Sequence, residues 1–295
     1  PKQWLINGNR LPWMLESYPT LEEENIKAGR TIDTWDVIKQ SAPMTEHELS
    51  VSGKGEQMTY YLSGAYTNQK SALAGDKFER LSVRANFDID ITKWLKIGTN
   101  SSFAMKDYSG NKADWGIAGW LSPFSSLRYD DGSLRRLPSG DGMITNPLWK
   151  VEMEDNKEVS YSLTNNNYMT VQLPLKGLSY QMNVANNLRF KELDNYIPSY
   201  DRDGFSWLGS GDKEHSFRHD LIFENILKYN NTFAEVHNVD VTLMYGYEQS
   251  KWSSSTLGSS NIFNDALGYN SLGIGENQTA ESGAGKSAAV SSMAR

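Results

Sequence analysis

The sequence predicts an all-β protein built from one antiparallel, up-and-down sheet. In the segments 78–91, 178–191 and 237–248, successive residues fall on two contrasting faces: 17 of 20 positions on one face are apolar, against 3 of 20 on the other. A period of two residues is typical of a β-strand with one apolar and one polar face. Short turn-forming segments also alternate with long connections along the chain, which favours consecutive hairpins.

The order of the expected elements follows from where this period begins. Residues 1–45 are expected to form a loop region, because Gly, Pro and Asn are scattered through them. From residue 46 onward period-two segments dominate, so residues 46–295 are expected to form a single β domain. About eight strands are expected, near 46–53, 57–68, 78–91, 94–106, 160–174, 177–193, 216–230 and 235–250.

The connections indicate what kind of sheet this is. Those after residues 53, 91, 174 and 230 are a few residues long, whereas long loops are expected near 107–160, 195–215 and 251–288. Short turns at one end and long loops at the other are typical of a transmembrane β-barrel, whose tilted strands need about 9–11 residues to cross a bilayer. A soluble β-sandwich also alternates apolar and polar residues, and it stays open as an alternative.

Composition excludes several classes of function. The formal net charge of −7 argues against a nucleic-acid partner, which requires a basic surface. The chain has no cysteine, which excludes disulfides, thiol catalysis and cysteine metal sites. No run approaches 18 apolar residues, so no transmembrane helix is expected. The chain opens on Pro1 without a charged and then apolar leader, so a signal peptide is expected to be absent or removed.

Candidate catalytic and metal-binding residues are few. His215 and His219 have the i, i+4 spacing of a helical zinc site, but they fall where a strand is expected to begin. The Asp-Gly segments 130–132 and 201–204 lack the spacing and the terminal Glu of a calcium loop, and ordinary turns explain them. Neither a nucleophile elbow nor a phosphate-binding Gly loop is found. We therefore expect a protein that is not an enzyme and that uses no metal or cofactor.

Aromatic residues in the expected long loops are the candidate substrate-binding residues. Exposed rings stack on sugar faces or hold apolar side chains of a peptide. The alternative is that these rings pack within the loops. The candidates are Trp115, Trp120, Phe124, Trp149 and Trp207.

Residues 47–104 carry a specific resemblance. They contain a strand that ends in a Ser-Gly turn, then a Tyr-Tyr-x-Ser-x-x-Tyr run, a Phe-x-Arg-x-x-x-Arg-x-Asn run and a Trp-Leu-x-x-Gly run. In this sequence the runs are Ser52-Gly53, residues 60–66, residues 78–86 and residues 94–98. With TWDVIKQSAP at 34–43 and LMYGYEQS at 243–250, the chain resembles the SusC/RagA family of TonB-dependent outer-membrane transporters over roughly residues 34–295. One departure, Lys70-Ser71 in place of the usual Gly after Asn-Gln, concerns a loop.

The resemblance implies part of a 22-stranded barrel in the outer membrane of a Gram-negative bacterium. Such a barrel is plugged by an N-terminal domain, is energised by the TonB complex, and imports oligosaccharides or peptides with a SusD-like lipoprotein. Neither a plug nor a TonB-binding segment is recognisable in this sequence, so it is expected to be a fragment of such a transporter. The alternative function is a soluble or surface-attached, β-rich, glycan-binding module without transport activity.

In such a barrel the two faces of the strand at 78–91 take different surroundings. The apolar face is expected to contact outer-membrane lipid through Leu81, Val83, Phe87, Ile89 and Ile91. The polar face is expected to line the lumen with Arg80, Arg84, Asn86, Asp88 and Asp90. The loops near 107–160 and 195–215 would then help to form the mouth.

Overall fold

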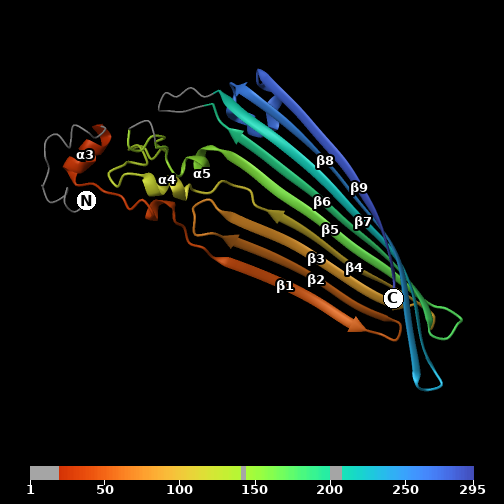
Figure 1. Cartoon of the computed structure of the whole chain (residues 1–295). Coiled ribbons are helices and arrows are strands. Elements are labelled where there is room, and N and C mark those ends of the chain that lie inside the picture. The colour runs from red at the N-terminus through yellow and green to blue at the C-terminus, as the bar shows by residue number, and fades with distance from the viewer. Residues whose placement is uncertain (1–19, 141–143, 200–207) are drawn as a thin grey trace.

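The computed structural model describes residues 20–140, 144–199 and 208–295. Within them, nine strands form one sheet in chain order, and all neighbouring strands are antiparallel (Figure 1). This confirms the predicted all-β, up-and-down fold. The strands are β1 (Met44–Lys54), β2 (Met58–Lys70), β3 (Lys77–Asp90), β4 (Leu95–Asp107), β5 (Asp155–Gln172), β6 (Leu178–Ile197), β7 (Gly209–Phe233), β8 (His237–Ile262) and β9 (Asn277–Ala294).

Short helices occupy the connections at one end of the sheet. They are α3 (Thr20–Ala28), α4 (Trp115–Trp120), α5 (Trp149–Met153) and the 3-10 helices η1 (Asp36–Ile38) and η2 (Asp265–Ile274). In the part of the chain that the structure describes, no helix is both long and apolar enough to cross a membrane. The loop prediction for residues 1–45 was wrong in part, because α3, η1 and the start of β1 lie within it; residues 1–19 lie outside the described residues.

The sheet has nine strands where about eight were predicted, and its strands are longer. The predicted loop at 251–288 was wrong: β8 continues to Ile262, and β9 begins at Asn277. The loops near 107–160 and 195–215 are likewise shortened by the starts of β5 and β7 and by the end of β6. The added parts of β8 and β9 escaped the sequence analysis because Ser, Gly and Ala replace the apolar residues. The start of β5 escaped it because Asp155, Asn156, Lys157 and Glu158 are all polar. Pairing with neighbours along the whole strand holds them in the sheet without an apolar face.

Tight turns close the hairpins at the other end, as predicted. Gly177, between β5 and β6, shows why the residue type matters: its φ of +83° lies in the left-handed region. A Cβ at this position would also lie 2.0 Å from the carbonyl oxygen of Asn230 in β7. Its own carbonyl accepts a hydrogen bond from the Asn230 N–H at 2.9 Å, so this turn is fastened to the next hairpin.

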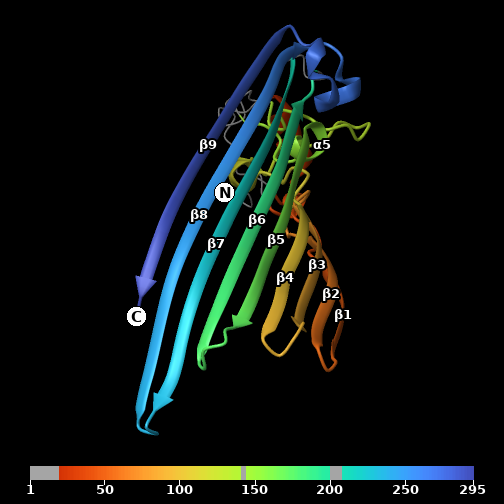
Figure 2. The ribbon, with the colours of Figure 1, turned by 90° about the vertical axis from the view of Figure 1, so that its right-hand side faces the viewer.

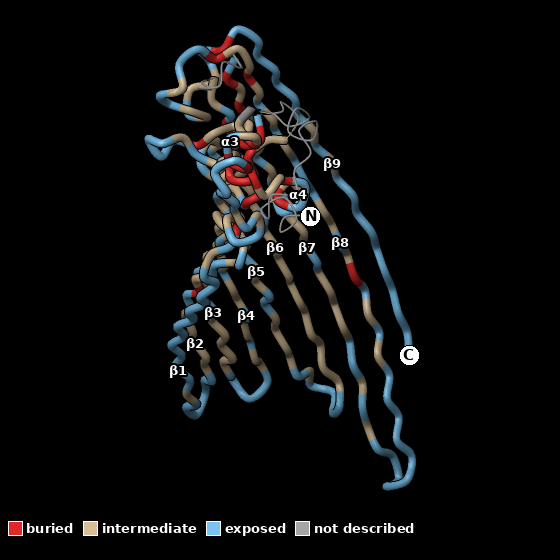
Figure 3. The backbone as a smooth tube through the Cα atoms, turned by 90° about the vertical axis from the view of Figure 1, so that its left-hand side faces the viewer, coloured by how far each residue is buried: buried red, intermediate tan, exposed pale blue. Residues whose placement is uncertain are grey.

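Most of the buried residues lie at the long-loop end rather than along the sheet (Figure 3). The described apolar core is a small cluster of Ile38, Ala113, Ala118, Leu134 and Leu148, against which Leu73 and Trp149 also pack. Along most of the sheet the large apolar side chains are partly or fully exposed instead. Among the described residues, the curved sheet seen in Figure 2 therefore has no apolar core of its own.

Helix η2 is held to the top of β6 by one carboxylate. Asp265 accepts a hydrogen bond from the Tyr196 hydroxyl at 2.6 Å, and it accepts two from Ser199, through the backbone N–H and the hydroxyl, at 2.8 Å each. Burial alone would raise the pKa of Asp265, but these hydrogen bonds outweigh it and hold the pKa below its ordinary value.

We expect the Asp265→Ala variant to loosen η2 at neutral pH. Loss of hydrogen bonds to a charged group speeds hydrogen exchange of the η2 amides by roughly tenfold to a hundredfold. Because the folded pKa is lowered, this contribution is present above about pH 4 and is lost as the pH falls through the folded value. The gap between variant and wild type should therefore close in acid. The Glu281→Ala variant, at an exposed position in β9, is the control; equal exchange of η2 in wild type and Asp265→Ala at pH 7 would contradict the assignment.

Candidate functional site: the two faces of the sheet and a cleft at its long-loop end

The polar positions of β3 lie on one face of the sheet and meet polar partners on both sides. Arg84 pairs with Ser63 and Ser102, and Asn86 pairs with Tyr61 and Asn100. Charges on this face are neutralised across strands: Arg80 lies 3.5 Å from Glu46 and Asp88 lies 3.5 Å from Lys96. The Tyr168 hydroxyl also donates to Asp88. The result is a wetted surface of paired charges and amides.

The apolar positions of β3 lie together on the other face. Leu81, Val83 and Ile91 are exposed, with 42 %, 49 % and 48 % of their surface accessible. Val83 pairs with Gly64 and Phe103, so the exposed apolar surface continues onto β2 and β4. A large exposed apolar surface of this kind needs a further apolar environment.

This apolar band slants across the sheet. In β3 and Ile91, which directly follows it, the apolar positions run from 81 to 91 and are centred on Asn86. Strand pairing carries the level of Asn86 across four strands to Glu248 in β8. The apolar positions of β8 run from 239 to 247 and are centred on Leu243, five residues lower. The band therefore shifts along the strands by one residue, about 3.3 Å, for each step of about 4.8 Å to the next strand. For the band to lie level in a membrane, the strands must be tilted by about 35° from the membrane normal. Membrane barrels have tilts of about 35–45°.

A cleft of 250 Å³ opens among the long-loop elements. It lies between α4, the loop before α5, α5 and the end of β6. Its walls combine apolar surface with charges of both signs. Its described lining residues are Asp114, Ile117, Arg136, Thr145, Asn146, Pro147, Trp149, Lys150, Glu154, Ile197 and Pro198.

The charged groups of the cleft differ in how they are held. The Asp114 carboxylate caps α4 by accepting the Ile117 N–H at 3.0 Å. Arg136 lies over the Trp149 ring, 5.5 Å from its centroid. Burial raises the pKa of Glu154, and the nearby Lys150 offsets this only in part. Such an arrangement suits a ligand with both charged ends and apolar parts.

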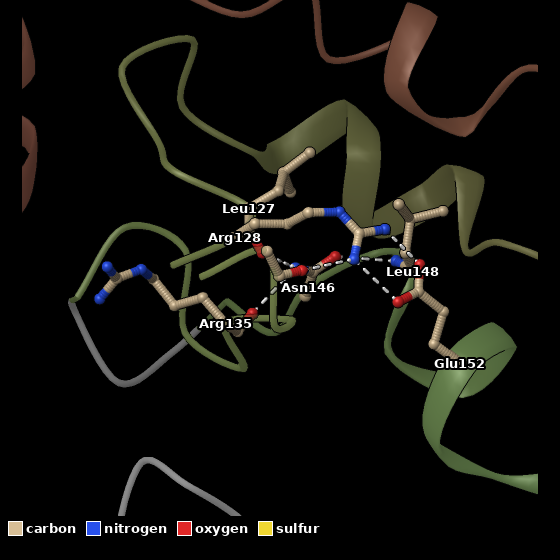
Figure 4. Close-up of polar contacts among 7 residues, drawn as sticks. Leu127, Arg128, Arg135, Asn146, Leu148 and Glu152 are labelled. Atoms are coloured by element: carbon tan, nitrogen blue, oxygen red, sulfur yellow. Dashed lines mark hydrogen bonds and ion pairs between the residues drawn. The ribbon is translucent and has the colours of Figure 1, made fainter. Parts of the chain in front are cut away.

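Asn146 organises the loop that carries this cleft (Figure 4). Only 3 % of its surface is exposed, and its amide nitrogen donates to the carbonyls of Leu127 and Arg135 at 2.8 Å each. Its oxygen accepts the Leu148 N–H at 2.9 Å, which sets the entrance to α5. Arg128 ties the same loop to α5 through Glu152.

The structure separates the five predicted loop aromatics. Trp149 lines the cleft, while one side of it packs against the apolar cluster. Trp115 and Trp120 lie on α4 with 64 % and 80 % of their surface exposed, outside the cleft. Phe124 was wrongly predicted as an exposed ring: it is 4 % exposed, and Asn25 of α3 donates to its carbonyl at 2.7 Å. Trp207 lies outside the described residues.

One aromatic residue on the polar face was missed by the sequence analysis. Trp252 of β8 faces the same side as Arg218, its cross-strand partner, and is 48 % exposed. It lies against the two glycines Gly283 and Gly285 of β9, which leave room for the ring. The signal available in the sequence was the pair of glycines, two residues apart in β9, that lie opposite this Trp. That signal could be used only once β9 was recognised as a strand.

The histidine pair does not form a metal site with its neighbours. His215 and His219 lie on the same face of β7; His215 lies 3.7 Å from Asp194, and His219 contacts Asn186 at 3.1 Å. Over residues 20–140, 144–199 and 208–295, no group of three or more His, Asp or Glu side chains is placed to hold a metal ion.

The fold and its two faces define a segment of a membrane-type β-barrel with a loop assembly at one end. No family model matches the sequence. It is 25 % identical over 229 residues to TonB-dependent receptor P39 of Formosa agariphila, covering 77 % of this chain and 22 % of that protein. It is 23 % identical over 270 residues to TonB-dependent receptor P3 of the same organism, covering 87 % of this chain and 26 % of that protein. The chain thus spans about a quarter of the length of the curated relatives that it matches.

Solved structures agree with these sequence relatives. The RagAB peptide importer in its closed-closed state superposes with a TM-score of 0.74 at 21 % identity, covering 90 % of this chain and 31 % of the other. The same importer in its open-open state gives a TM-score of 0.71, covering 90 % and 30 %. The resemblance to SusC/RagA-type TonB-dependent transporters predicted from the sequence is confirmed, and the fold is that of part of such a barrel.

We expect the Asn146→Ala variant to disorder the cleft while leaving the sheet intact. The substitution leaves two carbonyls and one N–H without their partner, at a cost of about 1–3 kcal/mol for each buried group. Limited proteolysis should then cut within 125–150 much faster than in wild type. The matched control is Asn68→Ala, at a partly exposed position in β2, where the amide donates to the Tyr66 hydroxyl. Unchanged protection of 125–150 in Asn146→Ala would show that Asn146 does not organise the loop.

Proposed function

We propose that this chain forms part of the wall and mouth of a TonB-dependent importer in the outer membrane of a Gram-negative bacterium. The observation that carries the proposal is the slanted apolar band on one face of a sheet whose other face is polar. A band that is level at a tilt of about 35° fits a bilayer, whereas the solvent face of a soluble sheet needs no such band. In this role Leu81, Val83, Phe87, Ile89 and Ile91 contact lipid, and Arg80, Arg84, Asn86, Asp88 and Asp90 line the lumen.

The cleft supports a substrate class within this function. Oligosaccharides and peptides are both candidate cargoes, and the opposite charges around an apolar floor favour short peptides. Arg136 and Lys150 would attract the carboxylate of a peptide, and Asp114 and Glu154 its amino group. Trp149 would contact an apolar side chain. Of the other aromatics, Trp115 and Trp120 are candidates for contacts outside the cleft. Trp207, which lies outside the described residues, stays a candidate from the sequence.

The proposed transporter works with partners that this chain does not contain. A SusD-like lipoprotein would close over the long-loop end, and the TonB complex would supply energy through the rest of the protein. The structurally similar RagAB is a peptide importer, which supports a peptide cargo for the proposed transporter. The proposed role is transport rather than catalysis.

The membrane orientation predicts that a lysine destabilises the protein very differently at two adjacent positions. We expect Phe87→Lys to cost about 2–4 kcal/mol, because it places a charge in the lipid near the middle of the band. Asn86→Lys, one position away on the polar face, should cost less than 1 kcal/mol. Insertion of the full-length protein into lipid vesicles, followed by urea unfolding, measures both. Equal tolerance of the two lysines, or a folded protein that stays monodisperse without detergent, would favour the soluble glycan-binding module instead.

The cleft predicts a separate effect on cargo. In the full-length protein, Arg136→Gln and Glu154→Gln are expected to weaken binding of short peptides by about tenfold each, through loss of one charge-assisted hydrogen bond. Binding of neutral oligosaccharides is the comparison. Glu48→Gln, on the polar face of β1 away from the cleft, is the control variant. Peptide affinities that match wild type in both cleft variants would remove the cleft from the proposed function.

A further inference from the structure

Two lysines face each other on the apolar side of the sheet. Lys251 of β8 pairs directly with Lys286 of β9, and both side chains are exposed. By the alternation of the strands they share the face of Tyr247 and Val290, not the polar face of Trp252. Like charges directly opposite one another in a sheet are destabilising, so an uncompensated pair of lysines needs an explanation.

No acidic residue on these strands compensates the pair. On this face β7, β8 and β9, which are described throughout, carry Lys213, His215, His219, His237, Lys251 and Lys286, but no Asp or Glu. The acidic residues of the three strands, such as Asp220 and Glu248, project from the opposite face. The neighbouring strand β6 carries two acidic residues on this face. Glu192 pairs with His215 two rungs above Lys251 and Lys286 and forms an ion pair with Lys157. Asp194 lies three rungs above the two lysines, near Lys213 and His215.

The charge is also local to this part of the sheet. At the corresponding upper edge of the apolar band on β3 and β4, the directly paired residues are Glu79 and Asp107. A general preference for cations along the rim therefore does not explain the lysines of β8 and β9. Along the upper edge of the apolar band, the charged residues instead change from acidic on β3 and β4 to basic on β8 and β9.

The position of the pair relative to the apolar band is specific. Tyr247 and Val290 pair with each other on the apolar side of Lys251 and Lys286, one rung beyond Gln249 and Ala288. On the long-loop side the next two rungs of β8 and β9 carry small residues on this face, with Ser253 opposite Ala284 and Ser255 opposite Ser282. Phe217 of β7 lies beside Ser253, and Leu257 of β8 follows one rung beyond Ser255. Going along the strands, the surface thus presents apolar side chains, then two cations, then small hydroxyl groups.

We propose that Lys251 and Lys286 bind the phosphate group of a phosphorylated glycolipid in the outer leaflet of the membrane. The inference rests on the membrane orientation under the proposed function, which places the long loops outside the cell. A phosphate between the two ammonium groups removes their repulsion and forms charge-assisted hydrogen bonds. The acyl chains then lie along Tyr247 and Val290, and the sugar of the headgroup lies over the shallow Ser-Ala surface.

The experiment measures lipid binding to the full-length protein in a neutral detergent by native mass spectrometry. The probes are phosphorylated lipid A, the same lipid A after removal of its phosphates, and inorganic phosphate. The variant is the double substitution Lys251→Gln with Lys286→Gln. The matched control is Lys96→Gln with Lys106→Gln, which removes two lysines from the polar face of β4. Thermal unfolding without lipid should show the Lys251/Lys286 variant to be at least as stable as wild type, because a repulsion is removed.

We expect the Lys251/Lys286 variant to bind phosphorylated lipid A about 25-fold more weakly than wild type, at about fivefold per lysine. The Lys96/Lys106 control should change by less than about twofold. The affinity of the wild-type protein for lipid A should fall by a similar factor when the phosphates of lipid A are removed. Unchanged binding by the variant, or equal binding of phosphate-free lipid A, overturns the proposal, and inorganic phosphate that binds as tightly as lipid A overturns the lipid as occupant. If lipid binding is unchanged in the Lys251/Lys286 variant while Phe87→Lys still costs more stability than Asn86→Lys, the phosphate site is wrong and the membrane orientation stands.

Discussion

Hydrogen bonding between neighbouring strands is the interaction on which the rest of this structure depends. The buried apolar cluster lies at the long-loop end, and no described residues form a core that holds the strands of the sheet below it together. Its backbone groups are satisfied by continuous antiparallel pairing, over 25 residues in β7 and 26 in β8. The same pairing explains why a segment as polar as β9 is a strand at all.

The two faces of the sheet solve different physical problems. On the polar face, charges of opposite sign pair across strands, as Arg80 does with Glu46 and Asp88 with Lys96. On the other face, apolar side chains remain exposed in a band that is level only if the strands are tilted. In the proposed transporter, lipid covers this band and supplies the burial that the chain cannot supply itself.

The long-loop end behaves as a small folded unit attached to the sheet. Ile38 and Leu148 pack in its core, Asn146 fixes its loop with three hydrogen bonds, and the cleft forms beside them. Aromatic residues have different roles within this unit: Phe124 is buried in the interior, whereas Trp149 lines the cleft. Binding chemistry is thus carried by a region with its own core, and the sheet below serves as its support.

The sequence by itself determined the all-β class, the hairpin order and the two faces of β3, because alternation of residues such as Val83 and Arg84 is a local property of the chain. It also predicted the short-turn end, where Gly177 marks a hairpin. Only the tertiary structure decided the extent of β8 and β9, whose Ser- and Gly-rich parts carry no local signal and are held by their neighbours. It alone decided which aromatic rings are buried. Phe124 and Trp149 are both aromatic residues of the same predicted loop, and they differ in what packs against them. The pairing of Lys251 with Lys286 likewise required the register, which no single strand encodes.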